Sequence, residues 1–191
     1  NGESVAIGSA ASSTQGASSV AIGNTAGQTN QGVSSVAIGN AAGNGNQGER
    51  SVAIGQNAGN GNQGENAVAI GFSAGQTSQA KNAVAIGFGA GGSSQHQQSI
   101  AIGNNAGSTS QYTNSVAIGT AAGFKDQSNN AVAIGFTAGS IRQGKNAVAI
   151  GNKAGYEDQH GNSLILNSSG SFVNSSGDNA WHVATQGSTT N

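Results

Sequence analysis

The chain has 191 residues, a net charge of −1, no cysteine, and only 7% charged and 4% aromatic residues. The lack of cysteine excludes a disulfide framework and a cysteine-ligated zinc site. The near-neutral charge argues against a nucleic-acid partner, because that interaction requires a basic surface. No apolar run is long enough to cross a membrane and no signal peptide is recognisable, so we expect no direct membrane contact in this segment.

One short motif, Val-Ala-Ile-Gly, recurs along the chain with a period of 16 residues. Its isoleucine recurs in phase from Ile22 to Ile150, Ile7 precedes them, and Leu166 continues the phase in a weakened copy. So strict a period indicates one structural unit stacked on itself. We therefore expect residues 1–167 to form a solenoid of about ten to eleven coils. Because the chain has no initiator methionine and begins within a repeat, we expect it to be a segment of a longer protein.

The coil at residues 66–81 shows the expected local structure. Val68 and Ile70 are two residues apart and share one face of a short strand, which ends at a glycine. Ala74-Gly75 marks a second corner, and a second short strand leads to Gln79. Asparagine, which tolerates left-handed backbone, recurs where the chain turns back. The prediction is an all-β fold: a flattened parallel β-solenoid with two short strands in each 16-residue coil.

The two faces of the Val-Ala-Ile strand are expected to have different roles. We expect the valine and isoleucine side chains to fill the coil. The alanine between them would then form a flat outer surface and contact other subunits. The predicted interface residues are Ala37, Ala53, Ala69, Ala85, Ala101, Ala117, Ala133 and Ala149.

A column of glutamine repeats with the same period. In stacked coils identical residues lie above one another, so their amides are expected to form a hydrogen-bonded ladder. The predicted ladder consists of Gln31, Gln47, Gln63, Gln79, Gln95, Gln111, Gln127, Gln143 and Gln159.

Residues 168–191 lose the phase and are rich in serine, asparagine, glycine and threonine. We expect them to form an irregular C-terminal cap or a transition to a following domain. An open solenoid end exposes core and strand edge, so Phe172 and Trp181 are candidates to cover the last coil.

The polar residues give no sign of catalysis, so we predict that the protein is not an enzyme and has no catalytic, cofactor-binding or metal site. His96 and His160 share a column but lie four coils apart, about 19 Å, too far to bind one metal. Glu49 and Glu65 stack in adjacent coils, with no basic or aromatic frame typical of a glycosidase pair. We expect them to lie on a solvated face.

Aromatic residues on this polar rod are candidate ligand contacts. Tyr112, Phe124 and Tyr156 fall in or beside the variable segment and are predicted to contact a ligand. A further column directly after the strand glycine contains Phe72, Phe88 and Phe136. These are expected to pack at a subunit seam or over a corner, or to be exposed ligand contacts.

The repeat resembles the head repeat of YadA-type trimeric autotransporter adhesins, and residues 115–119 (Ser-Val-Ala-Ile-Gly) are a full match. The resemblance implies a left-handed β-roll, a homotrimer, and attachment to host cells or matrix proteins. The ladder glutamine followed by glycine, as in Gln31-Gly32, departs from those repeats and is similar to fibre repeats of large DNA viruses and phages. The expected location is therefore extracellular, on a bacterial outer-membrane surface or a virion surface.

The predicted function is a trimeric attachment rod, either an adhesin head or a virion fibre segment. Its expected partners are other copies of itself and a host cell-surface or extracellular-matrix protein or glycan. The alternative is a purely structural spacer or capsid-associated segment with no ligand of its own. An enzyme-bearing tailspike would need an acidic groove that the sequence does not show.

Overall fold

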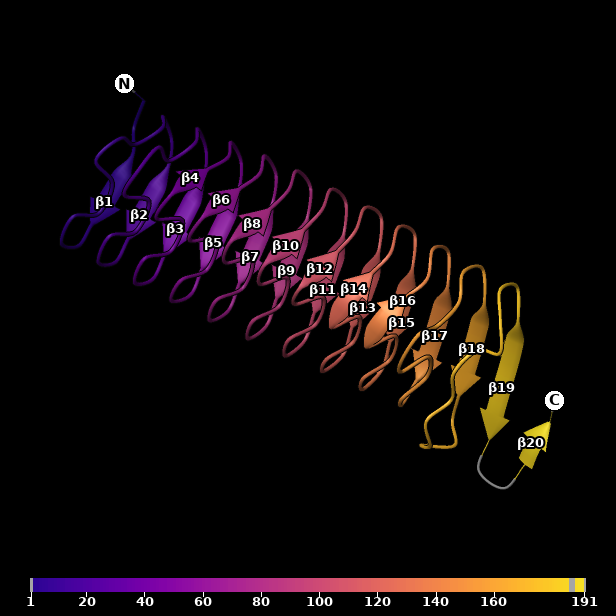
Figure 1. The fold of residues 1–191 in the computed structure, drawn as a ribbon. Helices are drawn as coiled ribbons and strands as arrows, with labels where there is room; N and C mark the ends of the chain where they lie inside the picture. Colours follow the sequence, from indigo (N-terminus) through magenta and orange to yellow (C-terminus); the bar gives the residue numbers. More distant parts are fainter. Residues whose placement is uncertain (1, 186–187, 191) are drawn as a thin grey trace.

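The computed structural model describes residues 2–185 and 188–190, where the chain forms strands and turns. Within these ranges there is no helix that could cross a membrane. The coils stack along one axis into a rod, with β1 (Val5–Ile7) and β20 (Ser188–Thr190) at opposite ends (Figure 1). The fold is the predicted all-β parallel β-solenoid, with about 11 turns spaced by about 16 residues.

One wall of the rod is a 13-stranded sheet in the described residues. All neighbouring pairs of strands except the last are parallel and in register, so Val68 pairs with Val84 and Ile70 with Ile86. Between β1 and β20 its strands are, in spatial order, β2 (Val20–Ile22), β3 (Val36–Ile38), β5 (Val52–Ile54), β7 (Val68–Ile70), β9 (Val84–Ile86), β11 (Ile100–Ile102), β13 (Val116–Ile118), β15 (Val132–Ile134), β17 (Val148–Gly151), β18 (Leu164–Asn167) and β19 (Trp181–Thr185).

The opposite wall is a 7-stranded sheet of shorter strands, each ending in a ladder glutamine. Most of these strands have an outward residue that is exposed or half-buried, followed by the buried glutamine. The strands are β4 (Asn46–Gln47), β6 (Asn62–Gln63), β8 (Ser78–Gln79), β10 (Ser94–Gln95), β12 (Ser110–Gln111), β14 (Lys125–Gln127) and β16 (Ile141–Gln143).

The space between the walls is narrow and contains mainly alanine and glutamine. From Ala21 and Ala26 to Ala149 and Ala154, the strand alanine and the corner alanine of each coil are 0% exposed. The glutamines fill the remainder and are at most 4% exposed from Gln31 onward. Close packing favours alanine in so narrow a core. Ile165, which follows Ala149 in the same column and is also 0% exposed, is a larger aliphatic side chain at the C-terminal end of this core.

The glutamine side chains cross-link this core in two directions. Within a coil, Gln95 Nε2 donates to the backbone carbonyl of Val84 on the opposite wall, at 2.7 Å. Between coils, Gln95 Nε2 donates to Oε1 of Gln111, at 3.2 Å. The same amide-to-amide bond links successive glutamines from Gln63 to Gln159. A buried amide needs such partners, because leaving it unpaired costs about 1–3 kcal/mol.

Glycine occupies two corner positions in most coils, where the backbone and the neighbouring atoms leave no space for a side chain. The strand-ending Gly71 has φ +125°, and a Cβ there would lie 2.7 Å from the carbonyl oxygen of Gly87 in the next coil. The corner Gly91 has φ +56°, and a Cβ there would lie 2.6 Å from Oε1 of the ladder residue Gln95. The strand-ending glycines let neighbouring coils stack closely. The corner glycines leave space for the buried glutamine amide.

Where the chain turns back, the structure shows the left-handed backbone that the asparagines indicated. Asn66, Asn82 and Asn114 have φ values of 56°, 60° and 59°. The side-chain amide of Asn66 donates to Oδ1 of Asn82 at 3.1 Å, so this corner has its own amide contacts. Asparagine therefore serves both the backbone conformation and the stacking.

The predicted irregularity of residues 168–191 is wrong for β19. Trp181 pairs with Leu164, and Val183 pairs with Leu166, so β19 continues the 13-stranded sheet in register. Trp181 follows its partner Leu164 by 17 residues, so a search for a strict 16-residue period misses this strand. The antiparallel strand β20 then pairs with β19. Whether this segment caps the rod stays a prediction.

Replacing a strand-ending glycine is expected to destabilise the rod strongly. In Gly71→Ala the new methyl group meets the next coil's backbone, and the free energy of unfolding should fall by more than about 3 kcal/mol. Chemical denaturation at a fixed protein concentration measures this change. Gly177→Ala is the matched control, because a Cβ at Gly177 has nothing within 4 Å. Equal stability of the two variants would contradict the proposed stacking constraint.

Candidate functional site

The outer surface of the 13-stranded sheet is a continuous strip of aliphatic side chains, here called the aliphatic face. It consists of the valine and isoleucine columns, which point away from the coil interior. From β2 to β15 these side chains are half-buried, because each is partly covered by its equivalents in neighbouring coils. At the C-terminal end Trp181, 81% exposed, and Val183, 48% exposed, continue the two columns.

The prediction that the strand alanines contact other subunits is wrong. Their side chains lie inside the coil of their own chain, and the valine and isoleucine expected there lie outside. The narrow interior is the reason, because alanine and glutamine already fill it. The alanines concerned are all 0% exposed: Ala37, Ala53, Ala69, Ala85, Ala101, Ala117, Ala133 and Ala149.

The phenylalanine column lies next to the aliphatic face, just after the strand glycine. Phe72 and Phe88 are 44% and 53% exposed, and their rings stack with centroids 5.2 Å apart. Phe136 is also 53% exposed. These exposed rings extend the apolar surface beyond the strands. Their place at a subunit seam or in a ligand contact stays a prediction.

The three predicted ligand contacts lie at separate places on the surface. Phe124 is 37% exposed and Tyr112 is 41% exposed. Tyr156 is half-buried against Phe172, with ring centroids 4.7 Å apart, and Lys153 Nζ lies 4.6 Å from the Phe172 centroid. Among the described residues, no ring contact joins any two of the three.

Tyr112 has a partner that sequence reasoning missed. Its ring stacks on that of His96, with centroids 4.9 Å apart and planes 14° apart. Both residues directly follow a ladder glutamine in adjacent coils, so their 16-residue spacing is the signal that would have found the pair. The stacked pair lies between two surface hollows. One, of about 310 Å³, is beside His96, and the other, of about 420 Å³, is beside Tyr112.

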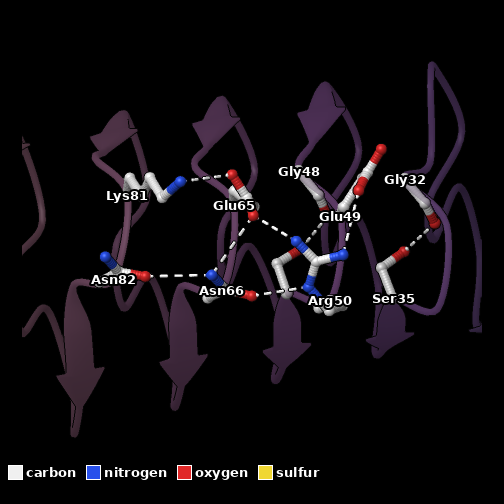
Figure 2. Close-up of polar contacts among 10 residues, drawn as sticks. Gly32, Ser35, Gly48, Glu49, Arg50, Glu65, Asn66, Lys81 and Asn82 are labelled. Atoms are coloured by element: carbon white, nitrogen blue, oxygen red, sulfur yellow. Dashed lines mark hydrogen bonds and ion pairs between the residues drawn. The ribbon is translucent and has the colours of Figure 1, made fainter.

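The acidic residues of the early coils are framed by basic ones, contrary to the prediction. Arg50 pairs with Glu49 at 3.1 Å and also with Glu65, and Lys81 Nζ lies 2.8 Å from Glu65 (Figure 2). Arg50 Nε also donates to Oδ1 of Asn66, at 2.9 Å. The cluster therefore links successive coils at the return corner, and its carboxylates are engaged in ion pairs.

A second ion-pair cluster lies near the C-terminal end. Arg142 pairs with Glu157 at 3.0 Å and donates to Asp158, whose Oδ2 is 2.8 Å away. The hydrogen bond from Arg142 lowers the pKa of Asp158 below its ordinary value, and the same bond raises the pKa of Arg142. Both clusters are solvent-exposed and link neighbouring coils, where such pairs contribute modestly to stability.

Potential metal ligands are scattered. Within residues 2–185 and 188–190 no three histidine, aspartate or glutamate side chains gather as a metal site would require. His160 Nδ1 lies 3.0 Å from Ser175 Oγ, and His182 Nε2 accepts from the backbone N–H of Ser176 at 3.2 Å. These two histidines are thus engaged in local contacts near the C-terminal end.

Comparison with family models identifies the repeat. The YadA head domain repeat matches in two copies, over residues 47–58 and 63–90. These two segments are similar to YadA head repeats. The same columns continue in register from β2 to β17, beyond the residues that the family model matches. Comparisons with curated proteins and with solved structures give no match. YadA-type heads belong to surface-exposed, homotrimeric adhesins.

The ion pair between Lys81 and Glu65 is testable by titration. The hydrogen bond from Lys81, assisted by Arg50, lowers the pKa of Glu65 below its ordinary value against an opposing effect of burial. A lowered pKa means that the pair stabilises the fold at neutral pH, and that this contribution is lost as the pH falls through that pKa. We expect Lys81→Gln to raise the pKa of Glu65, measured by carboxyl NMR.

Lys145→Gln is the control for that titration, because Lys145 forms no ion pair within the described chain and lies far from Glu65 in the stack. It should leave the Glu65 pKa unchanged. An unchanged Glu65 pKa in Lys81→Gln would show that the two side chains do not interact in solution.

Proposed function

We propose that the chain is a segment of a trimeric attachment rod that projects from a cell or virion surface and binds a host surface. The observation that carries the proposal is the YadA head repeat, since its family consists of surface adhesins. The fold supports it, because a rod of nearly uniform coils offers a long surface suited to repeated contacts.

Assembly is proposed to use the aliphatic face, with other copies of this chain as its partners. The valine and isoleucine columns carry no charged residue from β2 to β17, and they run straight along the rod. An apolar strip of this length is unusual on a monomeric protein and typical of an obligate interface. Identical flat strips on three copies can pack around one axis, and the family's homotrimeric state agrees with this number.

Host contact is proposed to use the opposite, 7-stranded wall. Packing of the aliphatic face against sister chains leaves that wall facing solvent, because the two sheets are opposite sides of one coil. Its outward residues also vary most between coils, from Asn46 and Ser78 to Arg142. Variable side chains on a uniform scaffold are where binding specificity is expected.

The attachment role is tested with the assembled chain on arrays of matrix proteins and glycans and on host cells. Saturable binding that the soluble chain competes away is the expected result. Failure to bind any cell, matrix protein or glycan would contradict the role and favour the structural spacer.

Charge placed on the aliphatic face is expected to block assembly. In the double variant Ile86→Asp/Ile118→Asp each carboxylate would be buried at the interface without a partner, at a cost of several kcal/mol. Sedimentation velocity should show a monomer in place of the wild-type assembly, while circular dichroism reports an unchanged fold. Ser78→Asp, on the exposed opposite wall, is the control and should assemble normally. An intact assembly of the double variant would exclude this interface.

A further inference from the structure

We propose that the hollow beside Tyr112 binds a neutral saccharide, with a pyranose ring stacked on the free face of the tyrosine ring. The inference rests on the proposed attachment role and deepens it, because it names the ligand class and the contact site. Its components are the His96–Tyr112 stack, the small residues on either side of that stack, and the unpaired polar groups around the hollow.

The stack leaves one face of each ring open along the rod. The ring centroids are 4.9 Å apart, about the rise between coils, so the rings lie across the rod axis. The column continues with Ala80 before His96 and with Ser128 and Gly144 after Tyr112. Because these neighbours are small, nothing covers the outer ring faces. Each ring therefore forms the end wall of a hollow.

The hollow beside Tyr112 has dimensions and polarity suited to a sugar ring. Its volume of about 420 Å³ lies within the range of small-molecule sites. Tyr112 is its aromatic wall, and Asp126, Ser128, Asn129 and Arg142 supply polar groups. The apolar C–H face of a pyranose fits an aromatic face, while its hydroxyl groups need polar partners at the edges.

Those polar partners are available. Within the described chain, the Asp126 carboxylate, the Ser128 hydroxyl and the Asn129 Nδ2 have no hydrogen-bond partner. Asn129 Oδ1 accepts from the backbone N–H of Thr113 at 3.1 Å, and this bond fixes the amide so that its donors remain free. A carboxylate acceptor, a hydroxyl and an amide donor together match the mixed donor and acceptor character of sugar hydroxyls.

The charges around the hollow favour a neutral ligand. Arg142 is neutralised by Glu157 and Asp158, with Nη2–Oε1 at 3.0 Å and Nη2–Oδ2 at 2.8 Å. Asp126 adds an unpaired negative charge, so acidic groups outnumber basic ones here. A sulfate, a phosphate or a sialic acid carboxylate in this hollow would lie beside the unpaired Asp126 carboxylate, with no free cation among the lining residues. An apolar peptide side chain would leave the Asp126 carboxylate, the Ser128 hydroxyl and the Asn129 amide without partners.

The geometry also indicates how a longer glycan would lie. A further hollow of about 290 Å³ shares Asn129 with the first and is lined by Thr113, Asn114, Asn130 and Lys145. A second sugar unit extending from the Tyr112 hollow would enter it. Three copies in one rod would present three such sites, so weak single-site binding becomes stronger on a multivalent surface.

The test uses the assembled chain and a panel of methyl glycosides of neutral hexoses and N-acetylhexosamines, with saturation-transfer NMR as the readout. At least one glycoside should receive saturation at its ring C–H protons. Tyr112→Ala should weaken its binding by about tenfold, which corresponds to the loss of a stacking contact of about 1.4 kcal/mol. Tyr112→Phe, which keeps the ring face, should retain binding.

Tyr156→Ala is the matched control, because that ring packs against Phe172 away from the hollow and its loss should not change binding. The inference is overturned if no glycoside binds, or if Tyr112→Ala binds as the wild type does. It is also overturned if Tyr112→Ala abolishes binding of a matrix protein while no glycoside binds. That last result would leave the attachment role intact. Conversely, if a glycoside binds but the chain attaches to no host cell or matrix protein, only the attachment role is contradicted.

Discussion

The buried glutamine ladder is the interaction on which the rest of the rod depends. Each ladder amide bonds the opposite wall of its own coil, as in Gln111 Nε2 to the Ile100 carbonyl at 2.7 Å. From Gln63 to Gln143 the amide also bonds the next coil, as in Gln111 Nε2 to Gln127 Oε1 at 3.1 Å. A side chain that holds both walls together sets the distance between them. Hydrogen bonds in a water-free interior also strengthen one another along a chain of amides, so the ladder favours uniform coils.

The narrow interior determines which side chains lie inside the coil and which lie on its surface. From the second to the tenth coil alanine is the strand residue buried beside the amides, and the larger valine and isoleucine side chains lie on the outside of the 13-stranded sheet. A single chain is thereby left with an apolar wall, which supports assembly with its own copies. The other wall carries the exposed residues that differ between coils, where a ligand would be recognised. Stability and recognition are thus assigned to different sides of one coil.

The sequence predicted the period, the two strands per coil and the corner residues, because each depends on local spacing and backbone preference. It did not predict which face of the strand lies inside. Alternation shows that Val68 and Ile70 share a face opposite Ala69, but not which face is buried. The assumption that larger apolar residues fill the interior fails here, because the buried glutamine occupies that space. Similarly, the 17-residue step to Trp181 escaped a search for a fixed period.

The candidate site was only partly predictable for a related reason. Tyr112 could be identified as an exposed aromatic residue. The hollow beside it, however, depends on the side chains at the same position in the two neighbouring coils. His96 on one side and Ser128 on the other become neighbours only when the chain is arranged by coils. Glu49 and Glu65 likewise gain Arg50 and Lys81 as partners through stacking. Linear motifs do not show such contacts, whereas columns of the aligned repeat do.

Hydrogen exchange of the glutamine side-chain amides tests the central claim most directly. The ladder amides of Gln79, Gln95, Gln111 and Gln127 are 0–2% exposed and hydrogen-bonded in the structure. The account predicts that their Nε2 protons exchange much more slowly than those of the exposed Gln97 and Gln98. Equally fast exchange in both groups would contradict the buried ladder, and with it the explanation for the outward position of valine and isoleucine.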